Sequence, residues 1–122
     1  MRALVVEDSS TIRKVLCLYL RNMNIESVEA ADGREGLERL RELPLDLVLL
    51  DWQMPVMDGI TFLRELRKMP AFDALPVIMV TTNSESEYVG QAMDAGANEY
   101  IQKPCTLDEL REKLDILGLL DL

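Results

Sequence analysis

Acidic side chains follow two apolar runs of the chain, at the points where strands would end. Asp51 follows the apolar run 47–50 and precedes a segment rich in proline and glycine. Glu7 and Asp8 follow the apolar run 3–6 in the same way. Because open α/β sheets place their functional groups beyond the carboxyl ends of the strands, we expect the three carboxylates to lie close together.

Three carboxylates at one edge of a sheet require a cation. Two carboxylates about 5 Å apart repel each other by about 3 kcal/mol at an effective dielectric constant of roughly 20. A site made of oxygen ligands favours Mg²⁺, or a similar hard cation such as Mn²⁺, that keeps several of its waters. Such an ion can neutralise and orient a phosphoryl oxygen, and Asp51 could then act as a nucleophile and form an aspartyl phosphate.

A hydroxyl group and a lysine end two further strand-like runs. Thr81 closes the run 76–81, and Lys103 follows the run 99–102. The lysine ammonium and the threonine hydroxyl could hold the other phosphoryl oxygens. Each residue also has an ordinary interpretation when it is taken alone, since Lys103 could be a surface lysine, Thr81 a strand-end residue and Asp8 a helix N-cap.

The composition of the chain excludes several classes of chemistry. The sequence has 122 residues, a formal net charge of -9 and no histidine. Nucleic-acid binding relies on clustered Lys and Arg, so no direct nucleic-acid partner is expected. Without histidine, Ser-His-Asp and Cys-His catalysis and imidazole metal ligands are excluded. Any chemistry must therefore use carboxylates, hydroxyls and lysine.

Length and hydropathy indicate one cytoplasmic domain over residues 1–122. A chain of this length buries enough surface for a single core without disulfides or a structural metal. No apolar stretch reaches the ~18 residues that a membrane span requires, so no membrane partner is expected. Cys17 and Cys105 have no paired spacing, which argues against a disulfide framework and a zinc site.

Strand-like and helix-like segments alternate five times along the chain. The strand-like runs cover residues 2–6, 25–29, 46–51, 76–81 and 99–102. The helix-like segments cover about 12–20, 34–42, 59–69, 84–96 and 106–117. Strands alternating with helices of ordinary length imply right-handed crossovers and a parallel sheet covered on both faces. The sequence therefore predicts an α/β fold with a doubly wound five-stranded parallel sheet.

Capping residues at the helix ends and apolar residues at helical spacing support these helices. Ser9 or Asp8 would cap the first helix, and the pattern Ser84-Glu85-Ser86-Glu87 is a capping box at the start of the fourth. Gly96 is predicted to end the fourth helix in a left-handed conformation. The first helix should face the core with the stripe Ile12, Val15, Leu16, Tyr19 and Leu20.

Taken together, the sequence resembles the receiver domains of two-component response regulators, most closely the single-domain chemotaxis (CheY-like) type. The resemblance covers essentially the whole chain. Spacing supports it, with 43 residues from Asp8 to Asp51, 30 from Asp51 to Thr81 and 22 from Thr81 to Lys103. The flavodoxin-like (βα)5 fold with strand order 2-1-3-4-5 is carried over from this resemblance. The motifs are Glu7-Asp8, the segment from Asp51 to Gly59, Thr81, the turn Asp94 to Ala97, Tyr100 and Lys103-Pro104.

The resemblance implies that Asp51 accepts a phosphoryl group, with Mg²⁺, from a histidine kinase, a phosphotransfer protein or a small acyl phosphate. Asp8 and Asp51 would ligate the metal directly. The Gln53 backbone carbonyl would be a third ligand, and Glu7 would act through water. A cis peptide between Lys103 and Pro104 would direct the lysine into the site.

The resemblance also implies a conformational switch. The Thr81 hydroxyl would be drawn to the phosphoryl group, and the Tyr100 ring would turn inward behind it, so that one of two existing states is favoured. A downstream protein would bind the face formed by the helix 84–96, the strand 99–102 and the helix from 106. The oligomeric state stays open between a monomer and a phosphorylation-dependent dimer.

Three departures from the usual family pattern surround the site. Glu7 stands where aspartate is commoner and has a longer arm. Thr82 stands where a small residue is usual, so it could narrow access to Asp51 or add a hydroxyl there. Gln53 and Asn83 occupy the positions at which family members tune hydrolysis of the phosphoryl group.

Three other functions share parts of the pattern. A Mg²⁺-dependent phosphohydrolase with an aspartate nucleophile usually has a general acid two residues later, where this chain has Gln53. A flavin-binding electron carrier would need a phosphate loop after the first strand, where Glu7-Asp8 would repel an anion. A receiver-like module that binds partners without phosphorylation would not need the intact acidic set. The sequence thus predicts a switch that modifies itself and does not turn over external substrates.

Overall fold

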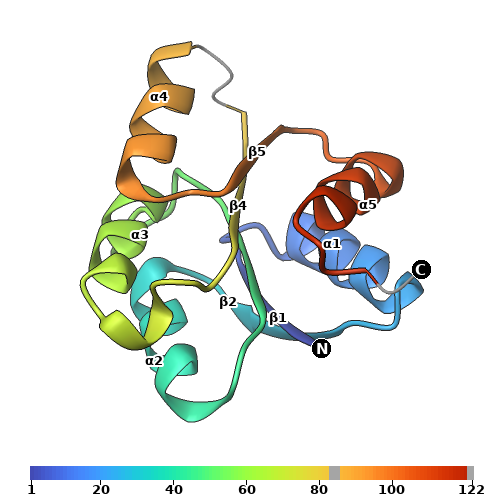
Figure 1. Cartoon of the computed structure of the whole chain (residues 1–122), viewed down its shortest axis with the longest axis horizontal. Helices are drawn as coiled ribbons and strands as arrows, with labels where there is room; N and C mark the ends of the chain where they lie inside the picture. Colours follow the sequence, from blue (N-terminus) through green and yellow to red (C-terminus); the bar gives the residue numbers. More distant parts are fainter. Residues whose placement is uncertain (83–85, 121–122) are drawn as a thin grey trace.

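The computed structural model describes residues 1–82 and 86–120, in which five strands alternate with five α-helices (Figure 1). A 3₁₀ helix, η1 (Pro70–Phe72), follows the third α-helix. The elements in chain order are β1 (Arg2–Val6), α1 (Ser10–Asn22), β2 (Glu26–Ala30), α2 (Gly33–Glu42), β3 (Leu47–Leu50), α3 (Gly59–Arg67), β4 (Val77–Thr81), α4 (Ser86–Ala95), β5 (Glu99–Gln102) and α5 (Leu107–Ile116).

The strands form one parallel sheet in the order β2-β1-β3-β4-β5. This confirms the predicted doubly wound, flavodoxin-like topology. Val6 of β1 lies opposite Leu50 of β3, and Leu50 lies opposite Met79 of β4. Since the strands are parallel and in this register, the residues that follow β1, β3 and β4 emerge at the same edge of the sheet.

Helices cover both faces of the sheet, with α1 and α5 on one face and α2, α3 and α4 on the other (Figure 1). Alternate strand residues point to opposite faces, so each strand supplies both cores. Burying one large apolar side chain contributes about 1.5–3 kcal/mol. The core beneath α1 and α5 includes Ala3, Val5, Leu16, Leu20, Leu49, Leu110 and Leu114. The opposite core includes Leu4, Val6, Leu40, Leu50, Phe62, Leu63 and Leu66.

Side-chain caps fix where the helices begin. Ser9, and not Asp8, caps α1, because its Oγ accepts a hydrogen bond from the Ile12 N–H at 3.3 Å. Gly96 has a φ of 111°, which agrees with the predicted left-handed end of α4. The predicted capping box begins at Ser84 and Glu85, which lie outside the described residues. Asp32, Asp58 and Thr106 cap α2, α3 and α5 in the same way.

Several boundaries differ from the prediction. β2 covers Glu26–Ala30, because Ile25 is buried in the preceding turn with its N–H bonded to the Leu20 carbonyl at 2.9 Å. The prediction that Val15 faces the core was wrong, since this residue in the middle of α1 is 38% exposed and lines an open cleft. Pro70 starts a 3₁₀ turn that the sequence did not predict. Among the described residues, no helix is both long and apolar enough to cross a membrane.

Candidate functional site

Three carboxylates meet at the carboxyl edge of the sheet. Glu7 and Asp8 follow β1, Asp51 follows β3, and these two strands are hydrogen-bonded neighbours. One carboxylate oxygen from each residue lies within 4.8 Å of the other two. Glu7 and Asp51 are 1% and 7% exposed, whereas Asp8 is exposed. The sheet therefore brings together the three acids that the sequence selected, with one side open to solvent.

Lys103 reaches this acidic cluster from the end of β5. Its Nζ lies 2.5 Å from Glu7 Oε1 and 3.3 Å from Asp51 Oδ1, and its side chain is 13% exposed. The peptide bond between Lys103 and Pro104 is cis, as predicted. A buried ion pair gains from its Coulomb attraction only if its geometry offsets the cost of desolvation. Here one ammonium offsets part of the negative charge of two nearly buried carboxylates.

Burial and neighbouring charges shift the pKa values of this pair. Burial raises the pKa of Glu7 to about 7, against the opposing effect of the Lys103 hydrogen bond. Burial alone would lower the pKa of Lys103, but the hydrogen bond to Glu7 and the charge of Asp51 outweigh it and raise that pKa. Lys103 therefore stays protonated at neutral pH, and its ammonium places a positive charge beside Asp51.

The loop after β3 fixes the backbone around Asp51. The Trp52 N–H donates to Asp51 Oδ1 at 2.8 Å, and the Asp51 N–H donates to the Val6 carbonyl at 2.9 Å. The Gly59 N–H donates to the Trp52 carbonyl at 2.8 Å. A Cβ on Gly59 would lie 2.0 Å from the Asp51 carbonyl oxygen, so only glycine fits this close approach. The spacing from Asp51 to Gly59 thus has a steric cause.

Thr81 and Tyr100 lie on the neighbouring strands β4 and β5. Thr81 ends β4 and is 1% exposed. Tyr100 is opposite Met79 in the sheet and packs against the same core as Met79, beneath α3 and α4. Since residues two apart in a strand share a face, Thr81 lies on this face too. Burial raises the pKa of the Tyr100 hydroxyl above its ordinary value.

A cavity of about 590 Å³ opens beside Asp8. Gln53 lines the same cavity and is exposed, and the role of its backbone carbonyl as a metal ligand stays a prediction. Asn83, the other predicted tuning position, lies outside the described residues. The remaining lining residues are Trp52, Met54, Pro55, Asp58 and Tyr88.

Sequence reasoning did not select Tyr88, which contacts the residue next to Asp51. The rings of Trp52 and Tyr88 meet edge-on, with centroids 5.3 Å apart and planes at 87°. This geometry is favourable for an aromatic pair. The contact depends on how α4 packs against the loop after β3, and no local sequence pattern indicates it.

The donor atoms at this edge fit a hard divalent cation. Glu7, Asp8 and Asp51 offer carboxylate oxygens, the ligands that Mg²⁺ prefers. Magnesium also keeps several waters, and the exposure of Asp8 leaves room for them. The residues present therefore match the predicted metal.

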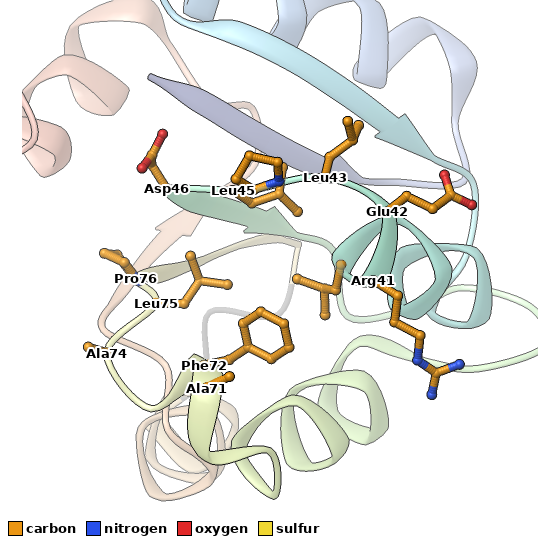
Figure 2. A pocket seen from close by; sticks show the side chains of 12 residues that line it. Arg41, Glu42, Leu43, Leu45, Asp46, Ala71, Phe72, Ala74, Leu75 and Pro76 are labelled. Carbon is orange, nitrogen blue, oxygen red and sulfur yellow. The ribbon is translucent and has the colours of Figure 1, made fainter.

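A further cavity, of about 630 Å³, lies at the opposite end of the sheet, before β3 and β4 (Figure 2). Phe72 and Leu75 from the segment between α3 and β4 lie opposite Leu43 and Leu45 from the segment before β3. The predicted site residues do not line this cavity. It is therefore separate from the acidic cluster.

Comparisons with known proteins identify the family of the chain. Residues 3–115 match the response regulator receiver domain family. The chain is 40% identical to the chemotaxis protein CheY-3 of Vibrio cholerae over 116 residues, which cover 94% of this chain and 89% of the relative. It is 38% identical to the chemotaxis protein CheY1 of Helicobacter pylori over 119 residues, which cover 96% of each chain.

Solved structures of receiver proteins are similar to this chain over nearly its whole length. The structure of CheY4 of Vibrio cholerae has a TM-score of 0.90 at 30% identity, and the match covers 95% of this chain and 97% of that chain. The receiver domain of a signal transduction histidine kinase from Syntrophus aciditrophicus has a TM-score of 0.86 at 32% identity, covering 95% and 88%. Because the family match spans nearly the whole chain and includes Glu7, Asp51 and Lys103, this chain belongs to the response regulator receiver domain family.

Proposed function

We propose that residues 1–122 form one receiver domain that works as a phosphorylation-activated signalling switch in a two-component phosphorelay. The observation that carries this proposal is the convergence of Glu7, Asp8, Asp51 and Lys103 at one sheet edge, with three carboxylate oxygens within 4.8 Å of one another. The phosphoryl group would come from a histidine kinase, a phosphotransfer protein or a small acyl phosphate.

Asp51 is the proposed phosphoryl acceptor. A carboxylate oxygen of Asp51 attacks phosphorus, the bond from phosphorus to the donor breaks, and the donor leaves with its bonding electrons. Lys103 already lies 3.3 Å from Asp51, so its ammonium is placed to attract the oxygens of the incoming group. When bound by Asp8, Asp51 and the Gln53 carbonyl, with Glu7 acting through water, Mg²⁺ supplies further positive charge for those oxygens.

Thr81 and Tyr100 are the proposed switch residues. The buried Thr81 ends β4, the strand next to β3, so it lies at the edge that would hold the phosphoryl group. Tyr100 packs on the core that also contains Ala92 of α4. A movement of Tyr100 would therefore change the packing of α4 and β5, which are part of the α4, β5 and α5 face at which we place the downstream protein partner.

The same site supports self-modification and not turnover of foreign substrates. Gln53 stands two residues after Asp51, and its amide cannot act as the general acid that phosphohydrolases with an aspartate nucleophile use. The expected activities are acceptance of the phosphoryl group by Asp51 and its later loss to water. The signal then passes by contact with another protein.

Acetyl phosphate tests the proposal directly. With Mg²⁺ and acetyl phosphate, the intact mass should rise by one phosphoryl group and the fluorescence of the single tryptophan, Trp52, should change. Asp51→Asn should abolish the mass gain. Asp58→Asn is the matched control, because it removes one charge from the same loop while asparagine can still cap α3. No mass gain in the wild type, or continuous turnover of acetyl phosphate without a modified chain, would contradict the proposal.

A further inference from the structure

We propose that Arg13 is a positioning residue for the metal site, and that it holds the peptide group between Glu7 and Asp8. This inference rests on the proposed Mg²⁺-dependent phosphorylation. Arg13 lies in the second turn of α1, and neither its position in the sequence nor its charge marks it as part of the site.

Arg13 connects the acidic loop to the edge strand of the sheet. Its Nη1 donates to the Glu7 carbonyl at 2.7 Å, and its Nε donates to Glu29 Oε1 at 2.8 Å. The Arg13 side chain is 17% exposed and that of Glu29 is 36% exposed, so both contacts are partly buried. The planar guanidinium presents these donors in a fixed geometry, so the contact with Glu29 orients the contact with Glu7.

The other polar atoms of Glu7 are also held. Its N–H donates to the Ala30 carbonyl at 3.0 Å, and its Oε2 accepts from the Ser9 N–H at 3.1 Å. Its Oε1 accepts from Lys103. Arg13 completes this set by binding the carbonyl oxygen, which is the Glu7 atom that belongs to the peptide leading into Asp8.

The backbone is what fixes Asp8. The Asp8 side chain is exposed, so packing contributes little to its direction. The preceding peptide group sets the position of the Asp8 backbone, and so the range of positions that the Asp8 carboxylate can reach relative to Asp51. Groups that orient metal ligands from outside the coordination sphere typically change metal affinity by about 10–100-fold when they are removed.

Lys14 provides a matched control on the same helix. Its Nζ lies 3.4 Å from Glu29 Oε2, so Lys14 and Arg13 share one carboxylate partner. Its side chain is 67% exposed, and among the described residues its ion pair is with Glu29. Removing either positive charge should strengthen cation binding slightly by electrostatics alone. If Arg13 positions the site, its removal should instead weaken Mg²⁺ binding.

The test compares the wild-type chain with Arg13→Gln, Arg13→Lys and Lys14→Gln. Mg²⁺ affinity is measured by titration of Trp52 fluorescence, and hydrogen exchange of the Ser9 amide is measured without metal. Arg13→Gln should weaken Mg²⁺ binding by about tenfold and speed Ser9 exchange. Lys14→Gln should leave Ser9 exchange unchanged, and its Mg²⁺ affinity should be unchanged or slightly higher. Arg13→Lys should be intermediate, because one ammonium is a single charge without the planar fork.

The outcomes separate this inference from the proposed function. If the wild-type chain binds Mg²⁺ and Arg13→Gln binds it with the same affinity, the positioning role of Arg13 is overturned but the proposed function is not. An equal loss in Lys14→Gln would assign the effect to the ion pair with Glu29 and would also overturn it. A wild-type chain that binds no Mg²⁺ would overturn the proposed function and this inference together. Melting temperatures of all four chains establish that each comparison is made on folded protein.

Discussion

At the scale of single residues, the position of Asp51 depends on a close contact between two backbone segments. The Cα of Gly59 faces the Asp51 carbonyl, and the Gly59 N–H is bonded to the Trp52 carbonyl at 2.8 Å. The sequence shows a glycine eight positions after Asp51, but it gives no reason for it. The structure supplies the reason, which is the space that a side chain would need.

Gly59→Ala should destabilise the chain and disturb the site. The added Cβ would lie 2.0 Å from the Asp51 carbonyl oxygen, and because this is a backbone atom the loop itself must move. We expect a loss of about 3 kcal/mol in the free energy of unfolding. Urea denaturation measures this loss, and a shifted Trp52 emission would report the moved loop.

Gly90→Ala is the control for this substitution. Nothing lies within 4 Å of a Cβ at Gly90, which is in α4. Alanine is the better helix former, so this variant should gain about 0.5–1 kcal/mol. If Gly59→Ala were as stable as the wild type, the steric explanation for the motif would fail.

The Cys105 thiol gives a pH-dependent prediction at the same scale. Burial, with a smaller effect of the Glu109 charge, raises the pKa of Cys105 from about 9 to about 11. Because the thiolate is the reactive form, alkylation by iodoacetamide at pH 8 should be about a hundredfold slower than for an ordinary thiol. The rate should rise about tenfold per pH unit until the pH nears that pKa.

Intact mass in a Cys17→Ser background measures this rate for Cys105 alone. Glu109→Gln removes the neighbouring charge and should therefore speed the reaction at pH 8. A fast, pH-independent reaction at Cys105 would show that the thiol is neither buried nor shifted.

At the scale of elements, local patterns predicted what depends on local contacts. The strand 99–102 and the left-handed end at Gly96 were predicted correctly, because alternation and turn chemistry are properties of neighbouring residues. Val15 was wrongly predicted to be buried, because helical spacing shows which side of a helix is apolar but not how wide the buried part of that side is. The contacts of Arg13, Tyr88 and Arg67 join segments that are distant in the sequence or depend on how helices pack, so no single-sequence pattern indicates them.

Arg67 joins the end of α3 to the turn between α4 and β5. Its Nη1 donates to the Phe72 carbonyl at 2.7 Å, and its Nη2 donates to the Gly96 carbonyl at 2.8 Å and to Asn98 Oδ1 at 3.0 Å. Asn98 Oδ1 also accepts from the Val77 N–H at 2.8 Å. One guanidinium therefore supports the start of β4 and the turn that precedes Tyr100.

Arg67→Met should lower the free energy of unfolding by about 2–3 kcal/mol, because it leaves partly buried carbonyls without their donors. Arg64→Met is the control, since Arg64 is exposed on the same helix and its loss should change stability by no more than about 0.5 kcal/mol. A double-mutant cycle with Asn98→Ala should show coupling of about 1 kcal/mol. Equal stability of the two arginine variants would contradict this role.

At the scale of the whole molecule, the fold gathers negative charge at one edge of a chain that is already acidic. The formal net charge is -9, and three carboxylates meet where β1 and β3 end. Repulsion of this kind opposes the compact state. A cation that binds the folded chain and not the unfolded chain should therefore stabilise the entire domain.

Mg²⁺ at about 100 times its dissociation constant should add about 2.7 kcal/mol to the free energy of unfolding. For a chain of 122 residues this corresponds to a rise of about 10 °C in melting temperature. The rise should disappear with EDTA and in Asp8→Asn, which loses a proposed ligand, and it should persist in Asp58→Asn. Because any salt screens a net charge of -9, the comparison is made against KCl of equal ionic strength. If KCl raised the melting temperature of the wild type and Asp8→Asn as much as Mg²⁺ does, the stabilisation would come from general screening, and the acidic cluster would not be a metal site.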